Sequence, residues 1–322
     1  MIWALPLPVA LPYLGSVTRT RLLAIFALLA LGGSAAIAFW FHDAWSTPMA
    51  RPLTIVHLMP VMLATLIVQG PLLRQPILGP LGLKVGLNRW WLAGWLGPVA
   101  VLALALLAVW ILFGVEPVLD PHTFVANKRT LVPEADLAAF DAHLSQNAPP
   151  HPLWLVAQAL PAGITLNLLV ALATEIGWRG LLFREMPGGF WMRSFGIGLF
   201  EAVWFVPIVL LGVHFPDHRL EGAACVAVWC LVASPVLVYL RVRADSVLAV
   251  AAFRGTLLAL TMAAADLAWG AEDWQRPFYG VAGILGMAVL LAGCWVHDRH
   301  FAAQRLMSAP APVPNVPDRE EE

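Results

Sequence analysis

The chain has 322 residues, of which 60% are hydrophobic and only 12% are charged, and its formal net charge is −1. A water-soluble domain of this length needs far more charge on its surface, so the composition indicates lipid as the solvent. No excess of basic residues is available for nucleic acid, which leaves the lipid bilayer as the expected partner. The 26 prolines and 15 tryptophans are also typical of membrane helices and of their interfaces. We therefore expect an all-α, polytopic membrane helix bundle.

A helix needs about 20 apolar residues to cross the hydrocarbon core of a bilayer. Eight segments of the chain meet this requirement and are separated by connections that carry the turn-forming and charged residues. The expected spans are residues 22–41, 53–70, 91–113, 153–175, 195–213, 222–240, 247–269 and 278–296.

The positions of arginine and lysine predict the orientation of the bundle. Thirteen of them lie in one alternating set of connections, and five lie in the other set: Arg51, Lys128, Arg129, Arg219 and Arg276. Because cytoplasmic connections carry the excess of positive charge, both termini are expected in the cytoplasm. The chain then divides into an N-terminal cytoplasmic or interfacial segment (1–21), a membrane bundle (22–300) and a tail (301–322) whose proline-rich, acidic composition predicts disorder.

Four ionisable residues fall at membrane depth, where a charge is costly and so indicates function by default. Glu175 and Arg179 lie at the predicted inner end of the fourth span, Glu201 lies in the fifth span and Arg254 in the seventh. The i, i+4 spacing of Glu175 and Arg179 allows a local ion pair that only marks a helix end. Glu201 could equally face a water-filled pocket, and Arg254 could contact an anionic substrate.

The residues around Glu175 resemble a known motif. Thr174-Glu175-Ile176-Gly177-Trp178-Arg179-Gly180-Leu181 is similar to the first motif (E-E-I-G-W-R-G-F/L) of the CAAX-protease and bacteriocin-processing (CPBP or Abi) family of intramembrane metalloproteases. The segment 201–207 resembles the second motif of this family (W-x-x-W-H-x-P), and 246–258 resembles the third. The resemblance covers residues 50–265 and implies a zinc-dependent endopeptidase that cleaves CAAX prenyl proteins or similar substrates, here in a bacterial plasma membrane.

This chain departs from the family pattern at the positions that the resemblance assigns to the metal and to the scissile carbonyl. Thr174 replaces the leading glutamate, Phe205 and Arg254 replace the two histidines, and Leu258 replaces the asparagine. Only Glu175 and Arg179 are retained. Eight of the nine histidines fall in expected loops or at span ends, with His57 alone inside a span. We therefore expect no cofactor, and zinc only if the family activity is retained.

Charge balance suggests a different role for the region where the resemblance implies the active site. Two acids and two arginines would lie together in this region, and an unpaired buried charge costs several kcal/mol. Since Glu201 lies one helical turn before Phe205, we expect Arg254 to pair with Glu201 where the metal would be. Three functions remain open: a catalytically inactive pseudoprotease that binds a membrane peptide, a prenylated tail or a partner protein; an active metalloendopeptidase with an atypical site; and a transporter or lipid-handling protein.

Overall fold

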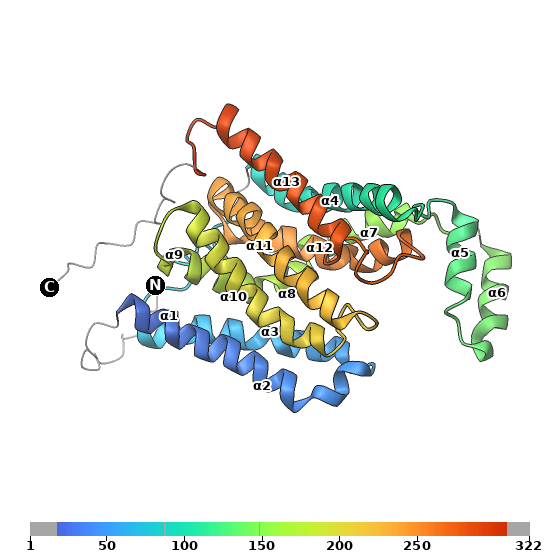
Figure 1. Cartoon of the computed structure of the whole chain (residues 1–322), viewed down its shortest axis with the longest axis horizontal. Coiled ribbons are helices and arrows are strands. Elements are labelled where there is room, and N and C mark those ends of the chain that lie inside the picture. Colours follow the sequence, from blue (N-terminus) through green and yellow to red (C-terminus); the bar gives the residue numbers. More distant parts are fainter. Residues whose placement is uncertain (1–17, 87, 148, 308–322) are drawn as a thin grey trace, which may run out of the picture.

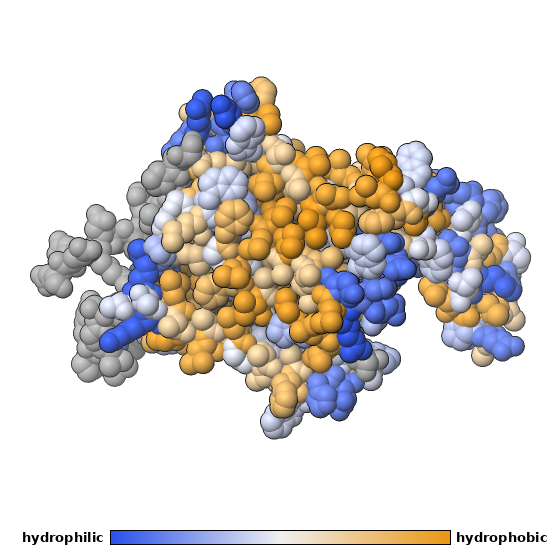
Figure 2. Space-filling view, viewed as in Figure 1, coloured by the Kyte–Doolittle hydropathy of each residue, from blue (hydrophilic) through white to orange (hydrophobic). Residues whose placement is uncertain are grey.

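The protein is a bundle of membrane helices with a small extramembrane hairpin at one end (Figure 1). The computed structural model describes residues 18–86, 88–147 and 149–307, and within these residues eight helices are long and apolar enough to cross a membrane. Hydrophobic side chains cover the middle of the bundle on the face shown in Figure 2, and polar side chains gather at its two ends. The chain is therefore an integral, multi-pass membrane protein, as its composition predicts.

The eight spans follow the chain in order, and seven of them lie within a few residues of their predicted places. They are α1–η1–α2 (Arg19–Ala27, Leu28–Gly32 and Gly33–Trp40), α3–η3 (Ala50–Ile67 and Val68–Leu72), α4 (Arg89–Phe113), α8–η5–α9 (Leu166–Glu175, Ile176–Leu182 and Phe183–Glu185), α10 (Phe190–Leu210), α11 (Arg219–Ala244), α12 (Val247–Leu267) and α13 (Val281–His300). The shorter helical segments are η2 (His42–Ser46), α5 (Pro121–Arg129), η4 (Glu134–Asp136), α6 (Leu137–Gln146) and α7 (Leu153–Ile164).

Helix α12 lies at the centre of the bundle. It packs against α4, α7, α8 and α11, and 72% of its apolar window is buried inside the protein, against 28% for α4 and for α13. Ser246 begins the helix by accepting a hydrogen bond from the backbone N–H of Leu248 at 3.2 Å, which satisfies one of the free donors of the first turn. Groups that must be kept from lipid are thus best placed on α12 and its neighbours.

The fourth span differs from the prediction. A single helix over 153–175 is wrong, because the chain forms a short helix α7, breaks at Thr165 (φ −115°, ψ −103°), and then forms the span 166–185. Pro161 lacks the N–H that would continue the helical ladder of α7. The Thr165 hydroxyl donates to the carbonyl of Pro161 at 2.8 Å, an alternative to helical pairing at this point.

One side of the break faces outward, and its other side faces α12. Thr165 and Leu166 are exposed, and Leu166 keeps 70% of its surface. On the inner side a Cβ atom added to Gly255 would come within 2.3 Å of the Gly163 carbonyl oxygen and 2.7 Å of the Leu168 nitrogen. Polar groups freed by the break find partners within the chain, since the Asn167 amide also donates to the carbonyl of Ala162 at 3.3 Å.

Two aspartates bind the connecting segments at the end of the bundle that lies opposite to the first residues of α1. Asp273 is buried and accepts hydrogen bonds from the backbone N–H groups of Asp217 (2.9 Å) and His218 (3.2 Å) and pairs with the His218 ring at 2.6 Å. The hydrogen bond to Asp273 raises the pKa of His218 above its usual value. Lys128 of α5 reaches Asp266 of α12 at 2.6 Å, so the projecting hairpin α5–α6 is tied to the central helix (Figure 1).

Part of the C-terminal tail that was predicted to be disordered is placed against the bundle. Leu306 and Met307 are buried, and both donate backbone hydrogen bonds to Asp298 of α13 at 2.9–3.1 Å. The rest of the tail, 308–322, lies outside the described residues, as does most of the N-terminal segment 1–21. The first residues of α1 and the end of α13 lie at the same end of the bundle (Figure 1), which fits an even number of spans; their cytoplasmic placement stays a prediction.

Replacing Gly255 by alanine is expected to lower the stability of the protein by about 1–3 kcal/mol, because the added methyl group would push against the backbone at the α7–α8 break. Thermal unfolding in detergent, followed by loss of the monodisperse species, measures the effect. Gly293→Ala is the matched control, since nothing lies within 4 Å of a Cβ at that helical, exposed position. Equal melting temperatures for the two variants would contradict the close approach.

Candidate functional site

Four charged side chains meet in the interior of the bundle and form what we call the central charge cluster: Glu175, Arg179, Glu201 and Arg254. Arg179 Nη1 lies 3.2 Å from Glu175 Oε1 and 2.8 Å from Glu201 Oε2. Arg254 Nε lies 3.3 Å from Glu175 Oε1, and its Nη2 donates to Glu201 Oε1. The contact between Arg254 and Glu201 is the one that charge balance led us to expect.

The cluster is a closed ring in which acids and arginines alternate. Each glutamate contacts both arginines, and each arginine contacts both glutamates. The exposed fractions are 0% for Glu175 and Arg179, 1% for Glu201 and 8% for Arg254. Charges removed so completely from water are tolerated only when they are paired, and the formal charges of the ring cancel.

The cluster lies nearer the middle of its spans than the sequence suggested. We expected Glu175 and Arg179 at the inner end of a span that closes at 175, but the observed span runs from 166 to 185, so both residues fall within it. Glu201 is likewise central in α10 (190–210). The shift follows from the break at Thr165, which makes α7 a separate helix and moves the whole span along the chain.

A π-helical segment shapes the cluster locally. Residues Ile176–Leu182 form a widened helix that carries Arg179 one turn after Glu175, and such segments are frequent at functional sites. Gly177 lets α3 approach, since a Cβ there would lie 2.7 Å from Val61 and 2.9 Å from the Thr65 hydroxyl. The i, i+4 spacing places Glu175 and Arg179 on one helix face, but it does not predict that this turn is π-helical.

Aromatic side chains cover the Arg254 side of the cluster. The Arg254 guanidinium lies over the ring of Trp229, 5.3 Å from its centroid, which favours a desolvated cation. Tyr279 packs at 5.0 Å from Trp229 and at 5.3 Å from Phe205, both as ring-centroid distances. His214 joins them at 4.7 Å from Tyr279.

The other positions named by the family resemblance contribute no charged or imidazole group. Thr174 is buried and donates its hydroxyl hydrogen to the Ala171 carbonyl of its own helix at 3.1 Å. Phe205 is buried against Trp204 and Tyr279, and Leu258 is half-buried on α12. At the three positions where the resemblance implies ligands, the side chains are therefore either apolar or already hydrogen-bonded.

Two histidines lie against the segment 201–207, where neither was expected from the sequence. The ring of His57 is fully buried at 4.7 Å from that of Trp204, and the ring of His214 lies 5.8 Å from that of Phe205. The sequence marked His57 in one respect, because it was the only histidine inside a predicted span. His214, which follows α10 and has a positive φ (66°), had no feature in the sequence that marked it. Burial lowers the pKa of His214 to about 4, so the ring is neutral at pH 7.

A zinc ion does not fit the donors of this site. Within residues 18–86, 88–147 and 149–307, no group of three or more histidine, cysteine, aspartate or glutamate side chains is placed to hold a metal ion. Both glutamates are already engaged by guanidinium groups, which stay protonated in proteins. A metal and two arginines would compete for the same carboxylate oxygens.

Two arginines that were predicted to lie in the connections are buried against the second half of the fourth span. Arg241 donates to the carbonyl of Arg179 at 3.3 Å, and Arg193 donates to those of Gly188 (2.8 Å) and Phe183 (3.1 Å). Backbone carbonyls left free at helix ends are natural partners for such donors. The end of the π-helical span is thus held in place by neighbouring helices.

The fold and the cluster define the class of protein as a multi-pass α-helical membrane protein with a buried ionic site. Comparison with protein-family models gave no match, and comparison with curated protein sequences gave none either. The resemblance to the CPBP family therefore rests on the motif residues themselves.

Neutralising one member of the cluster is expected to be more harmful than neutralising an acid and an arginine together. Glu201→Gln leaves one excess positive charge and Arg254→Gln one excess negative charge, each costing about 3–5 kcal/mol of stability. The double variant retains the neutral Glu175–Arg179 pair, so it should unfold at a higher temperature than either single variant. Melting temperatures in detergent test this expectation.

The matched control is Glu175→Gln with Glu201→Gln, which also changes two residues but leaves two buried arginines; it should be the least stable of the set. Exchanging Glu201 and Arg254 is a poorer test, because the exchange places an arginine beside Arg179 and a glutamate beside Glu175. A Glu201→Gln/Arg254→Gln double variant no more stable than either single variant would contradict coupling within the ring.

Proposed function

We propose that the protein is a non-catalytic relative of the CPBP intramembrane proteases that binds a membrane-embedded segment, or the lipidated tail, of a partner protein. The observation that carries the proposal is the closed central charge cluster. Glu175 and Arg179 keep the first motif, while Arg254 stands at a position that the resemblance assigns to a metal-binding histidine and engages both glutamates.

The chemistry of peptide hydrolysis supports this assignment. A general base must be free to take a proton from water within hydrogen-bond reach of the substrate. Each carboxylate of the cluster is held by two guanidinium groups and is closed off from solvent. Two acids in this state serve to neutralise two arginines and to join α8–η5, α10 and α12.

The binding role is supported by the outward side of the α7–α8 break. Leu166 and Leu169 expose 70% and 64% of their surfaces beside the non-helical Thr165. Exposed apolar side chains that lie together are typical of surfaces that another protein or the membrane covers. A membrane segment of a partner that packs over residues 164–169 would provide that cover. The same proposal places the protein in a bacterial plasma membrane.

A second function is favoured by one specific observation. Arg179 Nε and Nη2 and Arg254 Nη1 are buried donors without a hydrogen-bond partner in the described part of the chain. Buried donors of this kind normally find a partner, so a small anion moving through the bundle could use them. This is the transporter alternative, and uptake of labelled anions into vesicles distinguishes it from partner binding.

The proposed function is tested by photo-crosslinking in native membranes. A photoreactive residue at Leu166 should give a discrete crosslinked product, whereas the same residue at Val289 of α13, which is 53% exposed, should give lipid adducts only. Gly255→Ala, which disturbs the backbone of the break, should weaken the product at 166. The same pattern of products at both positions would reject a binding surface at the break.

Elemental analysis of the purified protein tests the non-catalytic half of the proposal separately. We expect no stoichiometric zinc in the wild-type chain, since its carboxylates are engaged by arginines. One zinc per chain, lost in Glu175→Gln, would overturn the proposal and favour a metalloendopeptidase with an atypical site. Restoring Thr174→Glu, Phe205→His, Arg254→His and Leu258→Asn together asks whether the missing ligands alone separate this chain from an active enzyme.

A further inference from the structure

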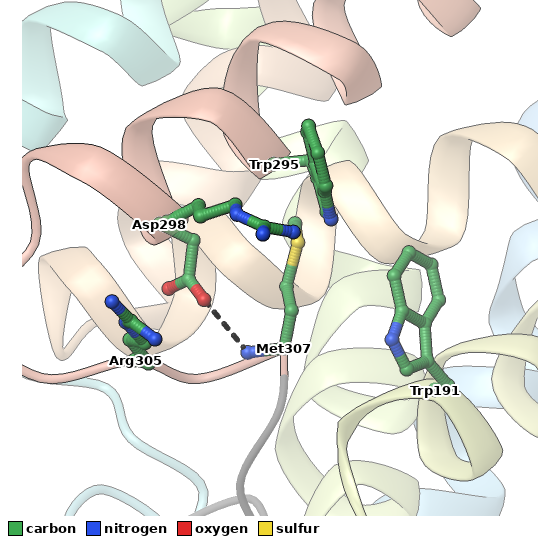
Figure 3. Close-up of a pocket in the computed structure, with 6 residues that line it drawn as sticks. Trp191, Trp295, Asp298, Arg305 and Met307 are labelled. Atoms are coloured by element: carbon green, nitrogen blue, oxygen red, sulfur yellow. Dashed lines mark hydrogen bonds between the residues drawn. The ribbon is translucent and has the colours of Figure 1, made fainter.

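A pocket opens at the end of the bundle where α13 finishes, away from the central charge cluster. Its cavity has a volume of about 140 Å³ and is lined by Trp191 of α10, by Trp295, Asp298 and Arg299 of α13, and by Arg305 and Met307 of the segment that follows (Figure 3). This volume is several times the ~30 Å³ share of one water molecule. The pocket is large enough for a phosphate-sized group.

The charges of the pocket are not balanced from within. Asp298 is the one acidic side chain among the lining residues, and it is already engaged by Arg243 Nη2 at 2.7 Å and by the backbone N–H groups of Leu306 and Met307. Figure 3 shows its carboxylate turned toward the Met307 nitrogen. Neither Arg299 nor Arg305 forms an ion pair with any acid in the described part of the chain. Two cationic groups are therefore available to a ligand.

The tryptophans place the pocket at the boundary between lipid and water. Trp191 is the second residue of α10 and Trp295 lies in the last turns of α13, so both stand at helix ends on the arginine-rich side of the bundle. Tryptophan collects at this depth because its ring is apolar and its N–H is polar. The Arg299 guanidinium lies 5.3 Å from the centroid of the Trp295 ring, which holds the cation beside the opening.

The apolar surface beside the pocket continues into the membrane. Along α13 the side chains of Val296, Val289 and Leu285 are exposed, and along α10 those of Met192, Phe195 and Leu199 are exposed. Acyl chains can pack along either helix while a headgroup sits between the arginines. Basic pockets between membrane helices at this level are the kind of site that anionic headgroups occupy.

We propose that this pocket binds a phosphate group presented by an anionic phospholipid, with Arg299 and Arg305 contacting the phosphate and the two tryptophans flanking the glycerol region. Asp298 acts as a positioning residue, because its carboxylate fixes Leu306 and Met307 and so carries Arg305 to the pocket. The proposal is independent of what the central charge cluster does.

Binding is measured by native mass spectrometry of the delipidated full-length protein in detergent, with dioleoyl phosphatidylglycerol or dioleoyl phosphatidylcholine added. We expect one tight site for phosphatidylglycerol and none for phosphatidylcholine. Arg299→Gln with Arg305→Gln should weaken phosphatidylglycerol binding by about tenfold to thirtyfold, since each basic residue near an anionic headgroup contributes about fivefold. Arg299→Lys with Arg305→Lys should retain most of the affinity.

The matched control is Arg19→Gln with Arg21→Gln, which removes two exposed arginines from the same end of the bundle but not from the pocket. An equal loss of affinity in this control would show general charge attraction and overturn the site. Undiminished binding in the Arg299→Gln/Arg305→Gln variant at an unchanged melting temperature would overturn it as well.

Displacement of the lipid by millimolar inorganic phosphate at constant ionic strength would assign the pocket to a soluble phosphate and overturn the lipid assignment. Binding that appears tight only after deletion of 308–322 would show that the acidic tail is the occupant, and would overturn it as well.

Discussion

The structure depends on the cancellation of four charges in a place without water. Arg179 and Arg254 cannot lose their protons, and neither can reach solvent, so each must lie beside carboxylates. Glu175 and Glu201 meet this need from two different helices. Because the four side chains come from α8–η5, α10 and α12, the cancellation fixes where these helices cross. A displacement of any one helix would separate at least two opposite charges at once, and this makes the crossing specific even though a buried ion pair adds little net stability.

The same constraint bears on function. A carboxylate that neutralises two guanidinium groups is a poor proton acceptor, and it cannot give its oxygens to a metal without releasing an arginine into the membrane interior. Structural and catalytic use of Glu175 and Glu201 therefore exclude each other in this arrangement. Arg254 is the residue that decides between them, because it engages both acids, and its position over Trp229 gives it a place that does not depend on the acids alone.

Much of the fold could be predicted from the sequence, because apolar length determines a membrane span almost alone. The exception is informative: residues 153–175 are mostly apolar, and hydropathy alone did not mark the break at Thr165. The break coincides with Pro161 and with hydrogen bonds of the Thr165 and Asn167 side chains. In the site, the cost of a charge at membrane depth identified all four members, and the need for neutrality predicted the Arg254–Glu201 contact. It could not give the cross-contacts from Arg179 to Glu201 and from Arg254 to Glu175, which depend on how the π-helical segment rotates Arg179 and on how α12 packs.

The arginines of this protein differ in the kind of partner that they have. At the centre of the bundle, Arg179 and Arg254 are matched by glutamates. Arg193 donates to the backbone carbonyls of Gly188 and Phe183. Arg241 lies between the carbonyl of Arg179 and the carboxylate of Asp245. At the end of α13, Arg299 and Arg305 form no ion pair with an acid in the described part of the chain, and Asp298 is committed to Arg243 and to the segment that follows α13. Under the proposal made for the pocket at the end of α13, the phosphate group of a membrane lipid supplies the negative charge that these two arginines need.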